Sequence, residues 1–147
     1  MWLKIPHDAL VFVGDGRKAL FLRNEGGAML PYLKAEKVLE DHNPPTHAQG
    51  SDRPGRVVES TSQRTALENA DWHDIEERRF VRRVAAEMKE LVRARSVKAI
   101  VVVAPPRALA ELRAAFHDDI KTRIVGEISK DLTKLPVGDI AQHLAAQ

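Results

Sequence analysis

The spacing of hydrophobic and polar positions changes along this chain. Near the start, two short apolar runs at 9–14 and 18–23 flank the dipeptide Asp15-Gly16, and a third alternating segment follows at 33–39. Asp-Gly supplies the positive-φ pair that a tight hairpin needs, so the first two runs are predicted to be antiparallel strands. The alternation in the third segment would place Ala35, Lys37 and Leu39 on one face of a strand, and Glu36 and Val38 on the other.

Between residues 72 and 96 the apolar positions follow the period of an α-helix. The sequence predicts that this helix ends near 94–96, with Asp71 or Asp74 capping its start and acidic residues in its first turn, where the helix dipole favours them. Its apolar stripe consists of Ile75, Phe80, Val81, Val84, Met88, Leu91 and Val92.

The rest of the chain is predicted to form the parallel half of a mixed sheet. The apolar run at 98–103 is typical of a strand buried on both faces, and Pro105-Pro106 ends it and begins a helix over 107–116. A strand at 122–128 and a last helix from about Pro136 complete the order β-β-β-α-β-α-β-α. We therefore predict an α/β, three-layer protein: a five-stranded mixed sheet with helices on both faces, in a ribonuclease H-like topology.

Length and composition bound the functions that are open to this chain. With 147 residues, 44% of them hydrophobic, it has the size of one domain with a real core. The absence of cysteine excludes disulfides and thiolate chemistry. The net charge of +2 means that polyanion binding would need local clusters. No apolar stretch has the length of a signal peptide or membrane span, so we expect a cytoplasmic protein without a membrane partner.

A long polar segment separates the two halves. From 41 to about 72 no regular pattern is visible, and residues 42–56 alone carry three prolines and two glycines. Connections this long are uncommon in compact domains and are usually functional or disordered. We therefore expect this segment to be a loop and the working part of the protein.

Arginines gather on the long helix. Two pairs stand one turn apart, a repulsive arrangement that a bound polyanion such as RNA would stabilise. The alternative is a solvated helix face with ordinary ion pairs, for example Arg83 with Glu87 and Glu90 with Arg93. The candidate nucleic-acid contacts are Arg78, Arg79, Arg82 and Arg83 on the helix and Arg53 and Arg56 in the loop.

Other chemistry finds little support in the residues. Two-metal cleavage needs carboxylates at the centre of the sheet, but the first strand is apolar and Asp15 is explained by its turn. His42 and His47 do not have the spacing of a known metal site. We therefore expect no metal and no cofactor. Asp131 and Thr133 are predicted to stabilise the turn into the last helix, with Leu132 and Leu135 in the core.

Three segments of the chain resemble a known bacterial family. Residues 51–56, 102–107 and 130–136, the last reading Lys-Asp-Leu-Thr-Lys-Leu-Pro, are similar to the family of host attachment proteins, and the likeness covers nearly the whole chain. That family is in turn similar to the central domain of archaeal and eukaryotic class-1 peptide-release factors. In those factors a Gly-Gly-Gln loop lies between a strand and a long helix, and its glutamine helps water to attack the ester of peptidyl-tRNA.

The resemblance implies a role for Gln49. This chain has Ala48-Gln49-Gly50 in the equivalent connection, so Gln49 is the candidate catalytic residue and the ribosome or tRNA the expected partner. Neither of the two residues before Gln49 is a glycine, whereas the two glycines of the release factors let the backbone approach a pocket closely. In the alternative, Gln49 is one polar residue of a polar loop that binds a protein partner. The protein would then be a non-catalytic module that acts indirectly in attachment to host cells.

Overall fold

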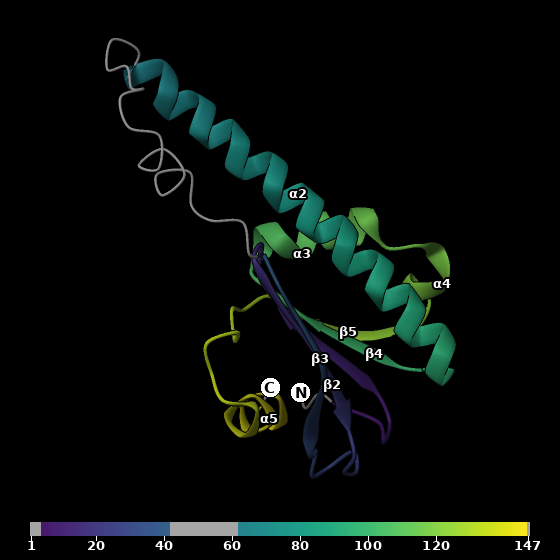
Figure 1. Cartoon of the computed structure of the whole chain (residues 1–147). Helices are drawn as coiled ribbons and strands as arrows, with labels where there is room; N and C mark the ends of the chain where they lie inside the picture. Colours follow the sequence, from purple (N-terminus) through teal and green to yellow (C-terminus); the bar gives the residue numbers. More distant parts are fainter. Residues whose placement is uncertain (1–3, 42–61, 147) are drawn as a thin grey trace.

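The structure is a computed structural model that describes residues 4–41 and 62–146, with side chains from Trp72 onward in the second range. Apart from one additional short helix, α4, the described strands and helices follow the predicted order (Figure 1). The elements are β1 (Leu10–Gly14), β2 (Lys18–Asn24), β3 (Leu33–Glu40), α2 (Ser62–Arg95), β4 (Ile100–Val103), α3 (Pro106–Ala115), α4 (Asp118–Lys121), β5 (Ile124–Ile128) and α5 (Val137–Ala145).

The five strands form one mixed sheet in the order β3-β2-β1-β4-β5. β1 is the central strand: it pairs antiparallel with β2, where Phe12 lies opposite Phe21, and parallel with β4, where Phe12 lies opposite Val102. β4 and β5 are also parallel. The predicted mixed sheet is therefore confirmed, and its order is compatible with a ribonuclease H-like arrangement.

Helices cover both faces of this sheet (Figure 1). Successive residues of a strand point to opposite faces, so β1 divides its side chains between two cores. Leu10 and Phe12 join the core under α2 and α3, while Val11 and Val13 join the core under α5. Because all of β1 is buried, it must be apolar at every position, as the sequence shows. The three-layer α/β class is thus confirmed.

β3 differs from the predicted strand in which faces its residues occupy. A bulge shifts the β2–β3 register between Phe21 and Leu22, so that Lys37 lies opposite Phe21 but Ala35 lies opposite Leu22. Phe21 belongs to the core under α2 and Leu22 to the core under α5. The prediction that Ala35 shares a face with Lys37 and Leu39 is therefore wrong, because the extra residue of a bulge reverses the alternation.

The long helix begins much earlier than its apolar stripe indicated. α2 starts at Ser62, so the part of the predicted loop at 62–72 is helical, and Asp71 and Asp74 lie inside the helix instead of capping it. Figure 1 shows the amino-terminal part of α2 extending beyond the sheet, where no core lies beneath it to require an apolar stripe. Ile75, predicted to be in that stripe, is 42% exposed.

The predicted turns are present, but the first does not use the expected positive-φ pair, because neither Asp15 nor Gly16 has a left-handed φ. Asp15 Oδ1 accepts hydrogen bonds from the backbone N–H groups of Arg17 and Lys18, both at 2.7 Å. Asp131 Oδ1 accepts from the Thr133 backbone N–H at 3.0 Å, and Leu132 beside it is buried. The short helix α4, between the two last parallel strands, was not predicted, because four residues are too few to show a helical period.

Candidate nucleic-acid interface

Two of the four helix arginines lie beside a groove. Arg78 and Arg82 project from α2 along one side of a groove of about 510 Å³ between α2 and α3. Both side chains are exposed, and no ion pair holds either of them among the described residues. Glu111 and His117 also line the groove. The remaining lining residues are small or apolar: Val81, Ala85 and Ala86 on α2, and Ala114 and Ala115 on α3.

The other two arginines have partners within the protein. Arg79 Nη1 lies 3.2 Å from Glu76 Oε1, and Arg83 Nη1 donates to the carbonyl oxygen of Glu40 at 3.3 Å. A residue one position along a helix is rotated by about 100°, so each pair faces its own side of α2. The structure therefore separates Arg78 and Arg82, beside the groove, from Arg79 and Arg83, which bind α2 itself and the end of β3.

The ion pairs of α2 also differ from those predicted. Glu87, the expected partner of Arg83, is bound by Lys37 of β3, with 2.5 Å between Nζ and Oε1. Arg93, expected to pair with Glu90, lies 3.9 Å from Asp119 of α4. The partners come from other elements because β3 and α4 lie against the flanks of α2, which spacing along one helix does not reveal.

Arg107 fixes α3 against α2 at one end of the groove. Its Nη2 donates to Asp74 at 2.7 Å, and its Nε lies 3.9 Å from Glu77 and 3.6 Å from Glu111. Burial, and then the negative charge of Glu111, raises the pKa of the Glu77 carboxyl. The positive charge of Arg107 lowers this pKa, but by less. The local charge is therefore mostly negative around Arg107 and positive further along, at Arg78 and Arg82.

The predicted loop residues cannot be placed in the same way. Gln49, Arg53 and Arg56 lie outside the described residues. In the chain they fall between Glu40, the last residue of β3, and Ser62, the first residue of α2. Ser62 is at the end of α2 that extends away from the sheet (Figure 1).

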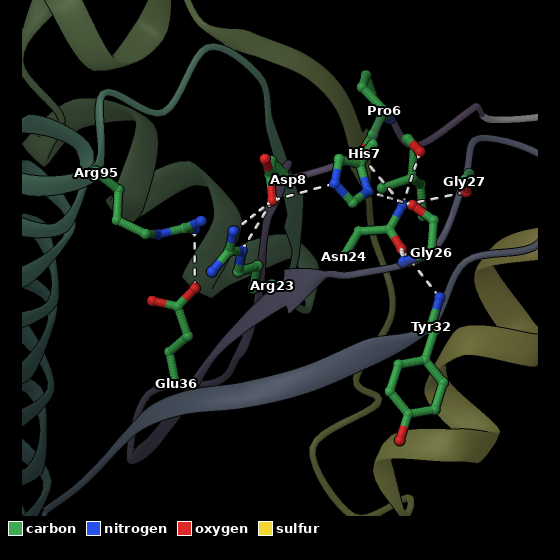
Figure 2. Close-up of polar contacts among 11 residues, drawn as sticks. Pro6, His7, Asp8, Arg23, Asn24, Gly26, Gly27, Tyr32, Glu36 and Arg95 are labelled. Atoms are coloured by element: carbon green, nitrogen blue, oxygen red, sulfur yellow. Dashed lines mark hydrogen bonds and ion pairs between the residues drawn. The ribbon is translucent and has the colours of Figure 1, made fainter.

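A second polar cluster lies at the other end of the sheet and was missed by the sequence analysis (Figure 2). Asp8 Oδ1 accepts from Arg23 Nε at 2.9 Å and Nη2 at 2.7 Å, and this hydrogen bonding holds the pKa of the Asp8 carboxyl below its usual value. Arg95 Nη2 lies 3.0 Å from Glu36 Oε1. Asp8, Arg23 and Arg95 border a cavity of about 620 Å³. Each pair joins residues distant in sequence, so no motif could have indicated them.

The fold and the site together define a class of protein. A mixed α/β sheet carries one helix that extends well beyond it, and a long connection joins the edge strand to the far end of that helix. A model of the family described as bacterial archaeo-eukaryotic release factor family 12 matches residues 8–144, and the chain belongs to this family. The relationship to release factors expected from the resemblance is confirmed. Among the described helices, none combines the length and hydrophobicity needed to cross a membrane.

Proposed function

We propose that this release-factor-like protein associates with RNA or the ribosome and releases or rescues nascent chains by promoting hydrolysis of peptidyl-tRNA. The segment from Asp41 to Gln63 is its working part, and Gln49 helps water to attack the ester. Family membership is the observation that carries this proposal. Four arginines of α2 and two of the preceding segment contact phosphates: Arg78, Arg79, Arg82 and Arg83, with Arg53 and Arg56. Arg78 and Arg82 contribute most, because their guanidinium groups are exposed and not engaged in described ion pairs.

The length of α2 supports this role. A helix of 34 residues is about 51 Å long, and among its described side chains those that join the core lie between Phe80 and Val92. Its first part extends beyond the sheet (Figure 1). A helix extended beyond its own core gains no burial there, so its length calls for another explanation. Carrying the preceding segment away from the sheet, toward a substrate bound elsewhere, is such an explanation.

Ala48 sets a limit on the chemistry. Release factors have a second glycine where this chain has a residue with a β-carbon, and a β-carbon narrows both the backbone conformations and the approach to a pocket. We therefore expect slower release than a Gly-Gly-Gln loop would give. Ala48→Gly should raise the rate if Gln49 acts as proposed.

The test uses stalled ribosomal complexes that carry labelled peptidyl-tRNA. Wild-type protein should release the peptide, and Gln49→Ala should reduce release at least about tenfold, as the loss of a residue that positions a reacting group does. Gln142→Ala is the matched control, because Gln142 is an exposed glutamine on α5, across the sheet from α2. Release that is absent, or that Gln49→Ala leaves unchanged, would remove the catalytic proposal.

A second candidate function is favoured by the loop between β2 and β3. Met29, Leu30 and Tyr32 are 62%, 83% and 66% exposed, and buried Asn24 holds the backbone around them. Exposed apolar side chains on a backbone that is held in place are typical of protein–protein contacts. The protein would then be a non-catalytic interaction module that acts indirectly in bacterial attachment to host cells. Peptide release that depends on Gln49 would count against it.

A further inference from the structure

We propose that the groove between α2 and α3 binds one unstacked nucleotide of an RNA strand. Arg78 and Arg82 hold its phosphate, the alanine-lined floor takes its base, and Glu111 accepts a hydrogen bond from an amino group of that base. The inference rests on the RNA contact of the proposed function and adds to it the part of RNA that is recognised.

The phosphate site follows from the two arginines. Residues four apart on a helix have β-carbons about 5–6 Å from each other, so both guanidinium groups can reach one phosphate. Guanidinium groups bind phosphate oxygens through paired N–H donors, and their planes also stack on bases. Within the described residues neither Arg78 nor Arg82 has an ion pair, whereas Arg79 and Arg83 have partners in the protein. The pair beside the groove is thus the pair available to a ligand.

The floor of the groove suits a flat ring. Ala86 and Ala114 are exposed on opposite sides, and Val81 and Ala85 are buried beneath them. The small side chains of both helices give the groove an apolar lining. Its volume of about 510 Å³ lies in the range of small-ligand sites. Of the residues that line the groove, His117 carries the one aromatic ring, so its imidazole is the stacking partner expected for a base.

Glu111 supplies the hydrogen-bond acceptor that would distinguish one base from another. Its Oε2 is buried and accepts no hydrogen bond among the described residues, while its Oε1 faces Arg107. An acceptor without a donor is unfavourable, and the terminal torsion of glutamate is soft enough to turn this oxygen toward the groove. Carboxylates accept hydrogen bonds from the amino group of cytosine. A nucleotide can offer an amino donor on its base beside its anionic phosphate, whereas the side chains of an acidic peptide offer only acceptors, which favours RNA as the ligand.

The experiment compares two RNAs whose bases differ at one edge: cytosine has an amino group at C4 and an acceptor at N3, whereas uracil has an oxo group at C4 and an N–H group at N3. Binding of the full chain to short single-stranded oligo(C) and oligo(U) of equal length is measured by fluorescence anisotropy. We expect oligo(C) to bind about five- to tenfold more tightly, the value of one good hydrogen bond. Glu111→Gln should remove the preference, because an amide can pair with either base. Equal binding of the two RNAs by the wild-type protein would overturn the role of Glu111.

Two further variants separate the groove from the arginines. Arg78→Ala/Arg82→Ala should weaken both RNAs at least tenfold and make the salt dependence shallower by about 1.4 log units per log unit, as expected for two phosphate contacts on a single strand. The control Lys130→Ala/Lys134→Ala, which removes two exposed lysines before α5, should change neither the affinity nor the salt dependence. Ala86→Leu fills the groove and should weaken binding similarly. Ala94→Leu, at another exposed alanine of α2, is its control, and circular dichroism checks the fold of each variant.

The failure of this inference can be told from failure of the proposed function. If the arginine variant loses RNA but Ala86→Leu binds normally, the arginines contact phosphate on an open surface and no base enters the groove. If an acidic peptide binds in place of RNA and is lost in the same variants, the ligand class is wrong. The release assay with Gln49→Ala is independent of both results, because Gln49 lies outside the groove-forming elements.

Discussion

Asn24 Oδ1 accepts a hydrogen bond from the backbone N–H of Tyr32 at 2.9 Å, which closes the loop between β2 and β3. The same oxygen accepts from the Gly26 N–H, and Nδ2 donates to the carbonyl oxygens of Ile5, Pro6 and Gly27 (Figure 2). Asn24 itself is fully buried. One amide side chain thus satisfies backbone groups of both the loop and the amino-terminal segment, in one buried and four partly buried hydrogen bonds.

Asn24→Ala should destabilise the protein by about 2–4 kcal/mol, because one buried and several partly buried backbone groups lose their partner at once. Asn24→Asp keeps the oxygen that accepts from Tyr32, but it turns a negative charge toward three carbonyl oxygens and should be comparably harmful. The free energy of unfolding in urea measures both. Glu25→Ala, at the exposed neighbour, should change it by less than about 0.5 kcal/mol. A small effect of both Asn24 variants would show that water replaces the side chain.

Ser96→Gly should stabilise the protein by about 0.5–1 kcal/mol. Ser96 follows the last residue of α2 with a φ of 53°, and the Val97 N–H reaches back to the carbonyl oxygen of Val92 at 3.0 Å. This is the Schellman ending of a helix, where glycine is preferred because it lacks the β-carbon that crowds a left-handed residue. Thermal unfolding measures the change, and Ser96→Val should shift the midpoint in the opposite direction.

Glu77→Gln should alter how stability depends on pH. Burial raises the pKa of Glu77 above its ordinary value of 4.5, so the folded state favours the protonated carboxyl. The contribution of Glu77 to stability is then complete below pH 4.5 and is lost as pH rises through the folded pKa. The stability of the variant relative to the wild type should therefore increase as the pH rises above 4.5. Urea unfolding across this range is the measurement, with exposed Glu90→Gln as control, and a gain independent of pH would contradict the assignment.

Thr133→Val should destabilise the protein by about 1–2 kcal/mol. The hydroxyl of buried Thr133 donates to Asp131 Oδ1 at 2.6 Å and lies 3.3 Å from Asp15 Oδ2, so it joins the turn before α5 to the first hairpin. Valine has nearly the same shape and removes only the hydroxyl. Thr133→Ser should retain most of the stability in the same unfolding experiment, and equal losses in both variants would point to the methyl group instead.

Arg23→Leu should bring the pKa of the Asp8 carboxyl back toward its usual value. The hydrogen bonds from Arg23 are the main cause of the present lowering, with smaller help from the charge of His7 and Arg95. The contribution of this pair to stability is present above the unfolded pKa of Asp8 and disappears as pH falls through the folded one. Carboxyl chemical shifts followed by NMR during an acid titration measure the change. Arg93→Leu, remote from Asp8, is a suitable control.

Part of the candidate site could be predicted from sequence. Arg78 and Arg82 were found because a run of like charges on a helix is visible in the sequence, and the relationship to release factors came from three short segments. The sequence does not show which of these arginines bind partners within the protein. Arg83 binds the backbone of Glu40, and Glu87 binds Lys37, through neighbours that are brought close only by the packing of β3 on α2.

The sequence by itself determined the local elements of the protein and the two faces of its central strand. A run such as Leu10–Val13 must be buried on both sides, and Asp15-Gly16 must turn, because burial and backbone sterics act over a few residues. Tertiary structure alone decided the start of α2, the reversed face of Ala35 and the groove beside Arg82. In each case the deciding contact, or its absence, involves an element distant in sequence, and no local pattern records it.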